Sequence, residues 1–145
     1  MASRTRAREL AMQVLFLWDT NGERDAQLAQ QLANDAPLAD EERRAGLQMA
    51  DDAWSARETS DAWIARLAPQ WPPRRQPGVD RSILRLAVWE LTAAPTPPKV
   101  VLDEAIEMAK SFSTEQSPAF INGVLDAVHK ESEALKAGPE DAKSE

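Results

Sequence analysis

Cysteine is absent from the 145 residues of the sequence, and histidine occurs once, at position 129. Without cysteine there is no disulfide framework, no thiolate metal site and no cysteine nucleophile. A single histidine without a cluster of other ligands makes a poor metal site, so His129 is interpreted as a surface residue near the end of a helix. The five glycines form no phosphate-cradling loop. These absences predict a protein with no catalytic residue, no metal and no cofactor.

Long hydrophobic runs are also missing. No apolar segment approaches the roughly 18 residues that a membrane-spanning helix needs. The basic N-terminus is not followed by a signal-peptide core, because Gln13 interrupts the apolar stretch 10–18 and Asp19 ends it. We therefore expect a chain that makes no contact with a membrane and works in the cytoplasm.

Charge is unevenly distributed along the chain. Seventeen lysines and arginines stand against 24 acidic residues, a net charge of −7 that argues against a general nucleic-acid binder. The basic residues gather in two clusters: Arg4, Arg6 and Arg8, and then Arg66, Arg74, Arg75, Arg81 and Arg85. An acidic body repels nucleic acid except at a defined basic site, so this pattern favours specific over indiscriminate binding.

Regular apolar spacing, broken by proline and glycine, predicts an all-α fold. The expected helices are 3–19, 23–34, one beginning near 40, one capped by Thr59-Ser60-Asp61, 81–93, 99–112 and one beginning at 117. Segment 81–93 is apolar on more than one face, as is typical of a central, buried helix. Residues 1–137 are expected to form one helical domain, followed by a polar, disordered tail over 138–145.

Four local expectations accompany this assignment. Asp80 is expected to cap the helix 81–93, and Phe112 to lie on the inward face of its own helix. Gly123 lies inside an apolar helical repeat, so it is interpreted as a small residue that lets a neighbouring helix approach closely. After Glu131 the sequence is polar, and the last helix is expected to fray.

The arginines of the first cluster break a local rule, because cations at a helix N-terminus oppose the helix dipole. Arg4 and Arg8, four residues apart, would also repel one another. Such violations suit a phosphate-binding site, to which the helix-end amides would add. On the residues alone, a solvated basic helix end explains the pattern equally well.

Two aromatic residues stand out by position. Phe120 lies three residues after Ser117, in the first turn of the last helix, where it suits either a stacking platform for an unpaired base or a core position beside Ile121. The tryptophans are expected mostly in the core or in grooves. Trp71, which lies between prolines, is the one expected to be exposed.

Four ordered segments resemble the motifs of one family, the NusB transcription antitermination proteins. They are RTRARELAMQVLF (4–16), VDRSILRLAVWEL (79–91), KVVLDEAIEMAKSF (99–112) and FINGVLD (120–126). The clear similarity covers about residues 3–18 and 79–129, whereas 22–77 agrees only in helical character and length. The resemblance implies a NusB-like bundle of about seven helices in two packed helical subdomains.

The resemblance also implies a function. NusB proteins bind the boxA element of nascent RNA together with NusE, a small-subunit ribosomal protein, and the pair loads onto the RNA polymerase elongation complex to promote processive transcription of ribosomal RNA operons. By position, the implied RNA-binding residues are Arg4, Arg6, Arg8, Lys110 and Phe120. Phe16 and Asp80 fall on positions associated with the protein partner. A homodimer is compatible with the family, in which some members self-associate.

Departures from the family pattern temper these expectations. Thr5 replaces a basic residue, the loop 92–98 lacks lysine and arginine, and Gln116 lies on a less charged edge of the RNA surface. This chain is therefore expected to bind RNA alone more weakly and to depend more on its partner. Two alternatives are kept: a detached NusB-like targeting module of a ribosomal RNA methyltransferase, and a helical protein–protein adaptor without RNA binding.

Overall fold

The structure, a computed structural model, describes the backbone of residues 4–143 and the side chains of residues 4–136. Within that range the chain is helical, without a strand. Its helices are α1 (Arg4–Asn21), α2 (Ala26–Asp35), α3 (Asp40–Ser55), α4 (Arg57–Leu67), α5 (Gly78–Ala93), α6 (Pro98–Phe112) and α7 (Ser117–Lys143), with a short 3-10 turn, η1 (Pro73–Arg75). The predicted all-α bundle of about seven helices is confirmed.

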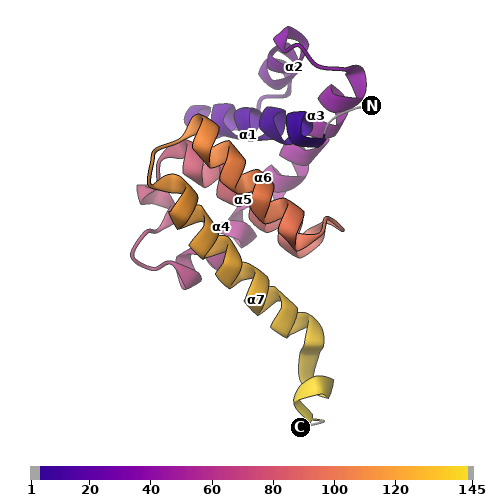
Figure 1. Ribbon diagram of the computed structural model, residues 1–145. Coiled ribbons are helices and arrows are strands. Elements are labelled where there is room, and N and C mark those ends of the chain that lie inside the picture. Colours follow the sequence, from indigo (N-terminus) through magenta and orange to yellow (C-terminus); the bar gives the residue numbers. More distant parts are fainter. Residues whose placement is uncertain (1–3, 144–145) are drawn as a thin grey trace.

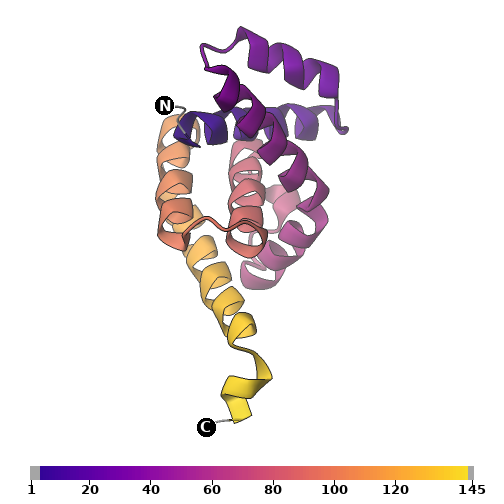
Figure 2. The same ribbon diagram turned by 90° about the vertical axis from the view of Figure 1, so that its right-hand side faces the viewer.

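Helix α5 is the centre of the molecule. It packs against α1, α3, α4, α6 and α7, and ten of its residues are buried. Helices α1 to α3 lie at one end of the molecule and α4 to α7 at the other, with α1 crossing α5 and α6 (Figure 1, Figure 2). The prediction that this apolar segment forms a central, buried helix is therefore correct. No helix in the described part of the chain has the length and apolar character to cross a membrane.

Of two helical glycines, Gly46 and not Gly123 allows another helix to approach closely. A Cβ atom added at Gly46 would lie 2.8 Å from both the carbonyl oxygen of Ala7 and the Cδ2 atom of Leu10, so α1 and α3 pack with almost no space between them. Gly123 is exposed, and nothing lies within 4 Å of its added Cβ. The expected close approach at Gly123 is therefore wrong, because that face of α7 points to solvent.

An ion-pair network joins the end of α1 to α4 and α5. Asp19 accepts hydrogen bonds from Arg81 at 2.6 and 3.1 Å and from Arg85 at 3.0 Å, while Arg85 also pairs with Asp61 at 2.7 and 2.9 Å. Arg66 is paired with Glu131 of α7. Three arginines of the second basic cluster thus hold helices together instead of presenting free charge.

Helix boundaries differ from the expected ones at three places. Helix α4 begins at Arg57, directly after a break at Ala56, so the predicted cap at Thr59-Ser60-Asp61 lies inside the helix. Helix α5 begins at Gly78, which places Asp80 within its first turn rather than at its cap. Helix α7 continues past Glu131 to Lys143, and Ser132 is buried, whereas residues 133–136 are exposed. Side chains of the expected tail, 138–145, lie outside the described residues.

Candidate nucleic-acid interface

The exposed N-terminal turn of α1 carries Arg4 and Arg6. Both side chains are exposed, and Thr5 between them donates a hydrogen bond of 2.7 Å to Glu104 of α6. Arg6 also lines a groove between α1 and the segment that links α2 to α3. These two arginines therefore present positive charge at the N-terminus of a helix, which itself favours anions.

Arg8 lies apart from the other two arginines of its cluster. The residue is 3% exposed, and its guanidinium makes two hydrogen bonds, of 2.8 and 3.0 Å, to the carboxylate of Glu90, which is 2% exposed. Thr96 donates a third hydrogen bond of 2.9 Å to the same carboxylate. Because its charge is paired with Glu90 and the residue is buried, Arg8 is not accessible to a phosphate group. The expectation that Arg8 contacts RNA directly therefore has no support in this geometry.

Glu90 is a residue of this site that the sequence did not single out. Its position does predict a buried ion pair, because Glu90 lies within a helix that is apolar almost all the way round. Acidic side chains are almost never fully buried without a partner, so a glutamate in such a helix implies a cation from another segment. The sequence did not indicate which arginine that cation would be.

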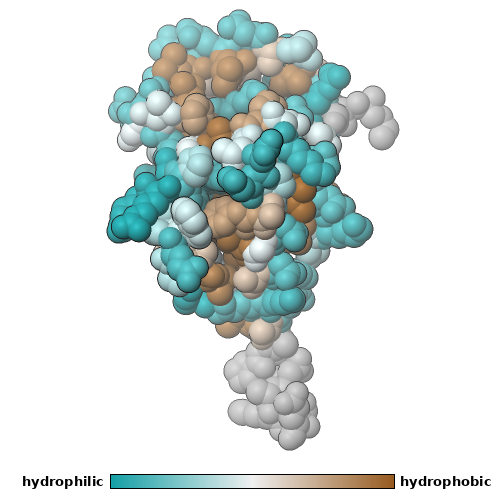
Figure 3. Space-filling model, turned by 60° about the vertical axis from the view of Figure 1, so that its left-hand side comes forward, coloured by the Kyte–Doolittle hydropathy of each residue, from teal (hydrophilic) through white to brown (hydrophobic). Residues whose placement is uncertain are grey.

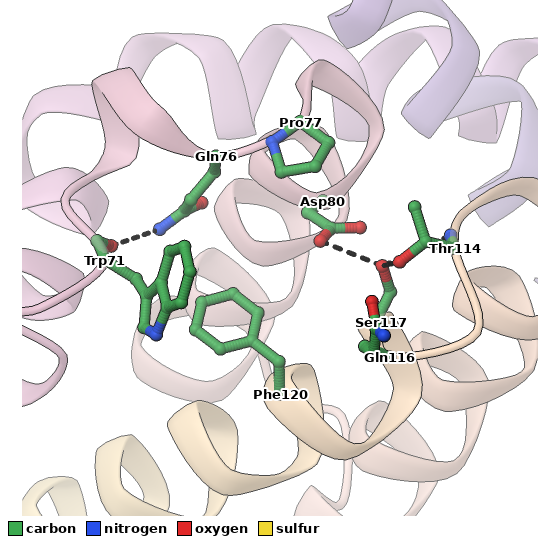
Figure 4. A pocket seen from close by; sticks show the side chains of 8 residues that line it. All are labelled: Trp71, Gln76, Pro77, Asp80, Thr114, Gln116, Ser117 and Phe120. Carbon is green, nitrogen blue, oxygen red and sulfur yellow. Dashed lines mark hydrogen bonds between the residues drawn. The ribbon is translucent and has the colours of Figure 1, made fainter.

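Phe120, at the start of α7, lines a cavity of about 370 Å³ together with Trp71, which comes from the loop after α4. The two rings meet edge to face, with centroids 6.4 Å apart. Figure 4 shows this pair on one side of the cavity and the carboxylate of Asp80 with the hydroxyls of Thr114 and Ser117 on the other. Trp71 is 57% exposed, as the sequence predicted, while Phe120 is half-buried.

Asp80 is buried in the wall of this cavity. Its two carboxylate oxygens accept hydrogen bonds from Ser113 at 2.5 Å and from Ser117 at 2.9 Å. These bonds attach the connection between α6 and α7 to the first turn of α5. A direct contact between Asp80 and a protein partner is therefore not available here, and the carboxylate acts by fixing the loop that precedes Phe120.

Phe16 borders a second, apolar groove of about 500 Å³. Phe16 and Phe112 are each 40% exposed and line it from α1 and α6, and Leu32 and Val79 line it as well. The predicted inward position of Phe112 is therefore wrong. Figure 3 shows hydrophobic surface in the upper part and the middle of the face that carries these helix ends.

Lys110, two residues before Phe112, is exposed and contacts only Glu107 at 3.4 Å within the described chain.

The predicted site residues thus fall into two groups at opposite ends of α5. Arg4 and Arg6 lie near the end marked by Glu90, whereas Phe120 and Lys110 lie near the end marked by Asp80. Ten residues of helix separate the two ends, about 15 Å. No group of acidic residues and histidine that could hold a metal ion occurs in the described part of the chain.

Comparison with known proteins places this arrangement in a family. The NusB family model matches residues 5–130. The transcription antitermination protein NusB of Solibacter usitatus is 42% identical over 142 residues, covering 96% of this chain and 97% of that protein. NusB of Symbiobacterium thermophilum is 42% identical over 135 residues, with 87% and 88% covered.

Solved structures agree with the sequence matches. The structure of T. maritima NusB superposes with a TM-score of 0.81 at 30% identity, covering 90% of this chain and 94% of that one. A structure of antitermination factors NusB and NusE in complex with double-stranded RNA gives a TM-score of 0.81 at 28% identity, with 88% and 96% covered. The fold and the order of helices are therefore those of solved NusB proteins.

Proposed function

Since this chain belongs to the NusB family of transcription antitermination proteins, we propose that it binds boxA-type single-stranded RNA together with NusE and so promotes processive transcription of ribosomal RNA operons. Antitermination is a binding function and not an enzymatic one, in keeping with the family. The relatives that match across most of both lengths carry the antitermination name, which supports this function over a methyltransferase module.

The RNA-binding part of the proposed function rests on the exposure of Arg4 and Arg6 at the N-terminus of an 18-residue helix. Two guanidinium groups and the N-terminal end of a helix all favour phosphate oxygens. The sequence carries a net charge of −7, so attraction of RNA depends on local groups of exposed cations such as this one. The solved complex of NusB with NusE and RNA supports the same function for a structural relative.

Arg8 takes a different part in this proposal. Its buried ion pair with Glu90 fixes the first turns of α1 against α5. Arg8 is therefore a positioning residue, which sets the direction in which Arg4 and Arg6 leave the surface.

The groove that Phe16 borders is the proposed docking surface for NusE. Exposed aromatic and aliphatic side chains that gather in one groove are typical of protein interfaces. Phe16 also lies against Gly78, because a Cβ added there would come within 2.9 Å of its ring. Glycine at the start of α5 thus leaves space for the aromatic ring to lie over the groove. Association with the RNA polymerase elongation complex is part of the proposed function, and a homodimer stays a prediction.

Fluorescence anisotropy with labelled boxA RNA tests the proposal at low and physiological salt, with and without NusE. We expect boxA to bind more tightly than a scrambled RNA, and NusE to tighten that binding. Replacing Arg4 and Arg6 together by alanine removes the preference, whereas Arg44→Ala, at an exposed arginine of α3, leaves it intact. Equal binding of boxA and scrambled RNA in all conditions would favour the protein–protein adaptor instead.

A further inference from the structure

Trp71 is a large aromatic side chain that the fold leaves mostly uncovered. It follows Pro69 and precedes Pro72, and its 57% exposure is the highest among the tryptophans of the described chain. Its ring meets Phe120 at an interplanar angle of 67°, and the pair forms one wall of the cavity shown in Figure 4. An exposed aromatic pair beside a cavity offers a face and an edge on which a flat ring can stack.

The same cavity contains a buried polar atom without a partner. Gln76 is 6% exposed and lines the cavity, and its Nε2 donates a hydrogen bond of 2.9 Å to the carbonyl oxygen of Trp71. Its Oε1 has no hydrogen-bond partner among the described residues. Because the amide nitrogen is committed to Trp71, the oxygen is left as an acceptor that only a ligand or water would satisfy.

Two arginines lie on the turn between Trp71 and Gln76. Arg74 and Arg75 belong to η1, both are exposed, and neither makes an ion pair within the described chain. The turn itself is held in place by Arg81, whose Nη1 donates to the carbonyl oxygens of Pro73 at 2.7 Å and of Gln76 at 3.1 Å. A fixed backbone therefore carries two unpaired cations directly between the residues that line the cavity.

We propose that this cavity receives one unstacked base of single-stranded RNA. Trp71 and Phe120 stack on the base, Gln76 Oε1 accepts a hydrogen bond from its exocyclic amino group, and Arg74 and Arg75 contact the adjoining phosphates. An acceptor at this position favours a base edge that presents an N–H group, such as the exocyclic amino group of adenine or cytosine, over an edge that presents only acceptors. The volume of about 370 Å³ lies in the range of small-molecule sites.

RNA is favoured over a peptide as the occupant by the combination of these features. Base–aromatic stacking and arginine–phosphate contact are the two interactions that single-stranded nucleic acids use most. The inference rests on the proposed function and adds a second contact region to it, at the other end of α5 from Arg4 and Arg6. One RNA strand would then run from one region to the other along α5, whose stretch from Asp80 to Glu90 is about 15 Å long.

A scan with 2-aminopurine, whose fluorescence falls when the base stacks, locates the occupied nucleotide. The labelled base replaces each purine of the boxA RNA in turn, and each RNA is titrated with the full-length protein. We expect strong quenching at one position with the wild type and none there with Trp71→Ala, which also binds about tenfold more weakly. Leu28→Ala, at an exposed apolar residue of α2, is the matched control and should change neither signal.

The proposed hydrogen bond to Gln76 is tested by changing the RNA rather than the protein. Replacing an adenine at the quenched position by purine riboside, which lacks the amino group, should weaken wild-type binding about fivefold. In Trp71→Ala the same replacement should have no effect, because the base is no longer in the cavity. Arg74→Ala with Arg75→Ala should reduce the magnitude of the salt slope by about 1.4, at about 0.7 per phosphate contact.

The possible results separate this inference from the proposed function. If boxA binding requires Arg4 and Arg6 but Trp71→Ala changes neither affinity nor quenching, the inference is overturned and the proposed function stands. If Trp71→Ala weakens only NusE binding, the cavity serves the protein partner and the inference is likewise overturned. If the wild type binds no RNA specifically, with or without NusE, both the inference and the proposed function are wrong.

Discussion

Arg8 and Glu90, 82 positions apart in the sequence, face one another inside the protein through two hydrogen bonds of 2.8 and 3.0 Å. Breaking a buried ion pair by removing one partner leaves a charge without compensation and costs about 3–5 kcal/mol. We therefore expect Arg8→Ala to lower the free energy of unfolding by that amount in urea denaturation. Arg4→Ala and Arg6→Ala, at exposed positions, should each change it by less than about 0.5 kcal/mol.

A paired replacement checks the cause of that loss. Replacing both partners by apolar residues of similar size, Arg8→Met with Glu90→Leu, removes the buried charges together and should recover most of the stability. If the double variant is as unstable as Arg8→Ala, packing rather than the unpaired carboxylate explains the effect. A loss of RNA binding in Arg8→Ala is informative only under conditions in which the variant is folded.

Two glycine-to-alanine replacements should change stability in opposite directions. Gly46→Ala forces a Cβ to within 2.8 Å of the backbone of α1, and overpacking of this kind costs about 1–3 kcal/mol. Gly123→Ala places its Cβ in open space on a helix, where alanine is better than glycine by about 1 kcal/mol. Thermal melts followed by circular dichroism measure both. A melting temperature that rises in Gly46→Ala would contradict the tight α1–α3 contact.

The carboxylate of Asp19 should make the protein sensitive to acid. Burial acts to raise the pKa of Asp19, but the hydrogen bonds and charges of Arg81 and Arg85 outweigh it and hold the pKa below its ordinary value of 3.8. A depressed pKa in the folded state gives stability that is fully present above the ordinary value and is lost as the pH falls through the folded-state pKa. Urea unfolding across the acid range should therefore show declining stability below about pH 4.

Asp19→Asn is the variant that isolates this effect. It should be less stable than the wild type at neutral pH and should show a shallower loss of stability in acid. Asp103→Asn, which removes a surface pair with Lys99, serves as the control and should follow the wild-type curve. Parallel curves for wild type and Asp19→Asn would exclude Asp19 as the source of the acid sensitivity.

RNA affinity should depend only moderately on salt. Arg4 and Arg6 account for about 1.4 of the slope of log affinity against log salt, at about 0.7 for each single-strand phosphate contact. Arg74 and Arg75 would add about as much again, so we expect a total near −2.8. Anisotropy titrations over a range of salt concentrations give the slope. A value near −7 or beyond would mean that many more cations contact the RNA than these four.

Phe16 and Asp80 should affect NusE binding in different ways. Phe16→Ala removes an exposed ring from the groove, so it should weaken NusE binding at least tenfold without changing the melting temperature. Asp80→Ala releases Ser113 and Ser117 from a buried acceptor, so it should lower the melting temperature first. Calorimetric titration with NusE and thermal melts distinguish the two. Equal destabilisation by both variants would mean that Phe16 is part of the core.

Local features of this fold follow from the sequence, whereas pairings over long distances do not. The apolar repeat of α5 and the prolines around Trp71 act within a few residues, so they correctly predicted a buried helix and an exposed tryptophan. Arg81 and Arg85 find Asp19 across 62 and 66 positions, and only the packed helices bring them together. The sequence alone marked these arginines as a basic cluster, because neither composition nor spacing shows which charges neutralise one another.

The family motif illustrates the same limit at the candidate site. Similarity placed Arg4, Arg6 and Arg8 together on the basic start of α1, since they share one helix and lie two residues apart. A helix turns about 100° per residue, so Arg6 points away from Arg8, whereas Arg4 shares the side of Arg8 but lies one turn earlier, at the end of the helix. Arg8 faces α5 through its pair with Glu90, while Arg4 and Arg6 are exposed. The two glycines differ for a similar reason, because only Gly46 lies on a face that meets another helix.

The side chains that hold the turn between Trp71 and Gln76 all donate to backbone carbonyl oxygens, those of Trp71, Pro73 and Gln76. The side chains of Arg74 and Arg75 take no part in maintaining its shape. These two positions can therefore change during evolution without refolding the turn, and each exchange would alter what the turn recognises. Relatives with the same backbone would then diverge in nucleotide preference by mutation at two sites, while the rest of the fold remains under selection for stability.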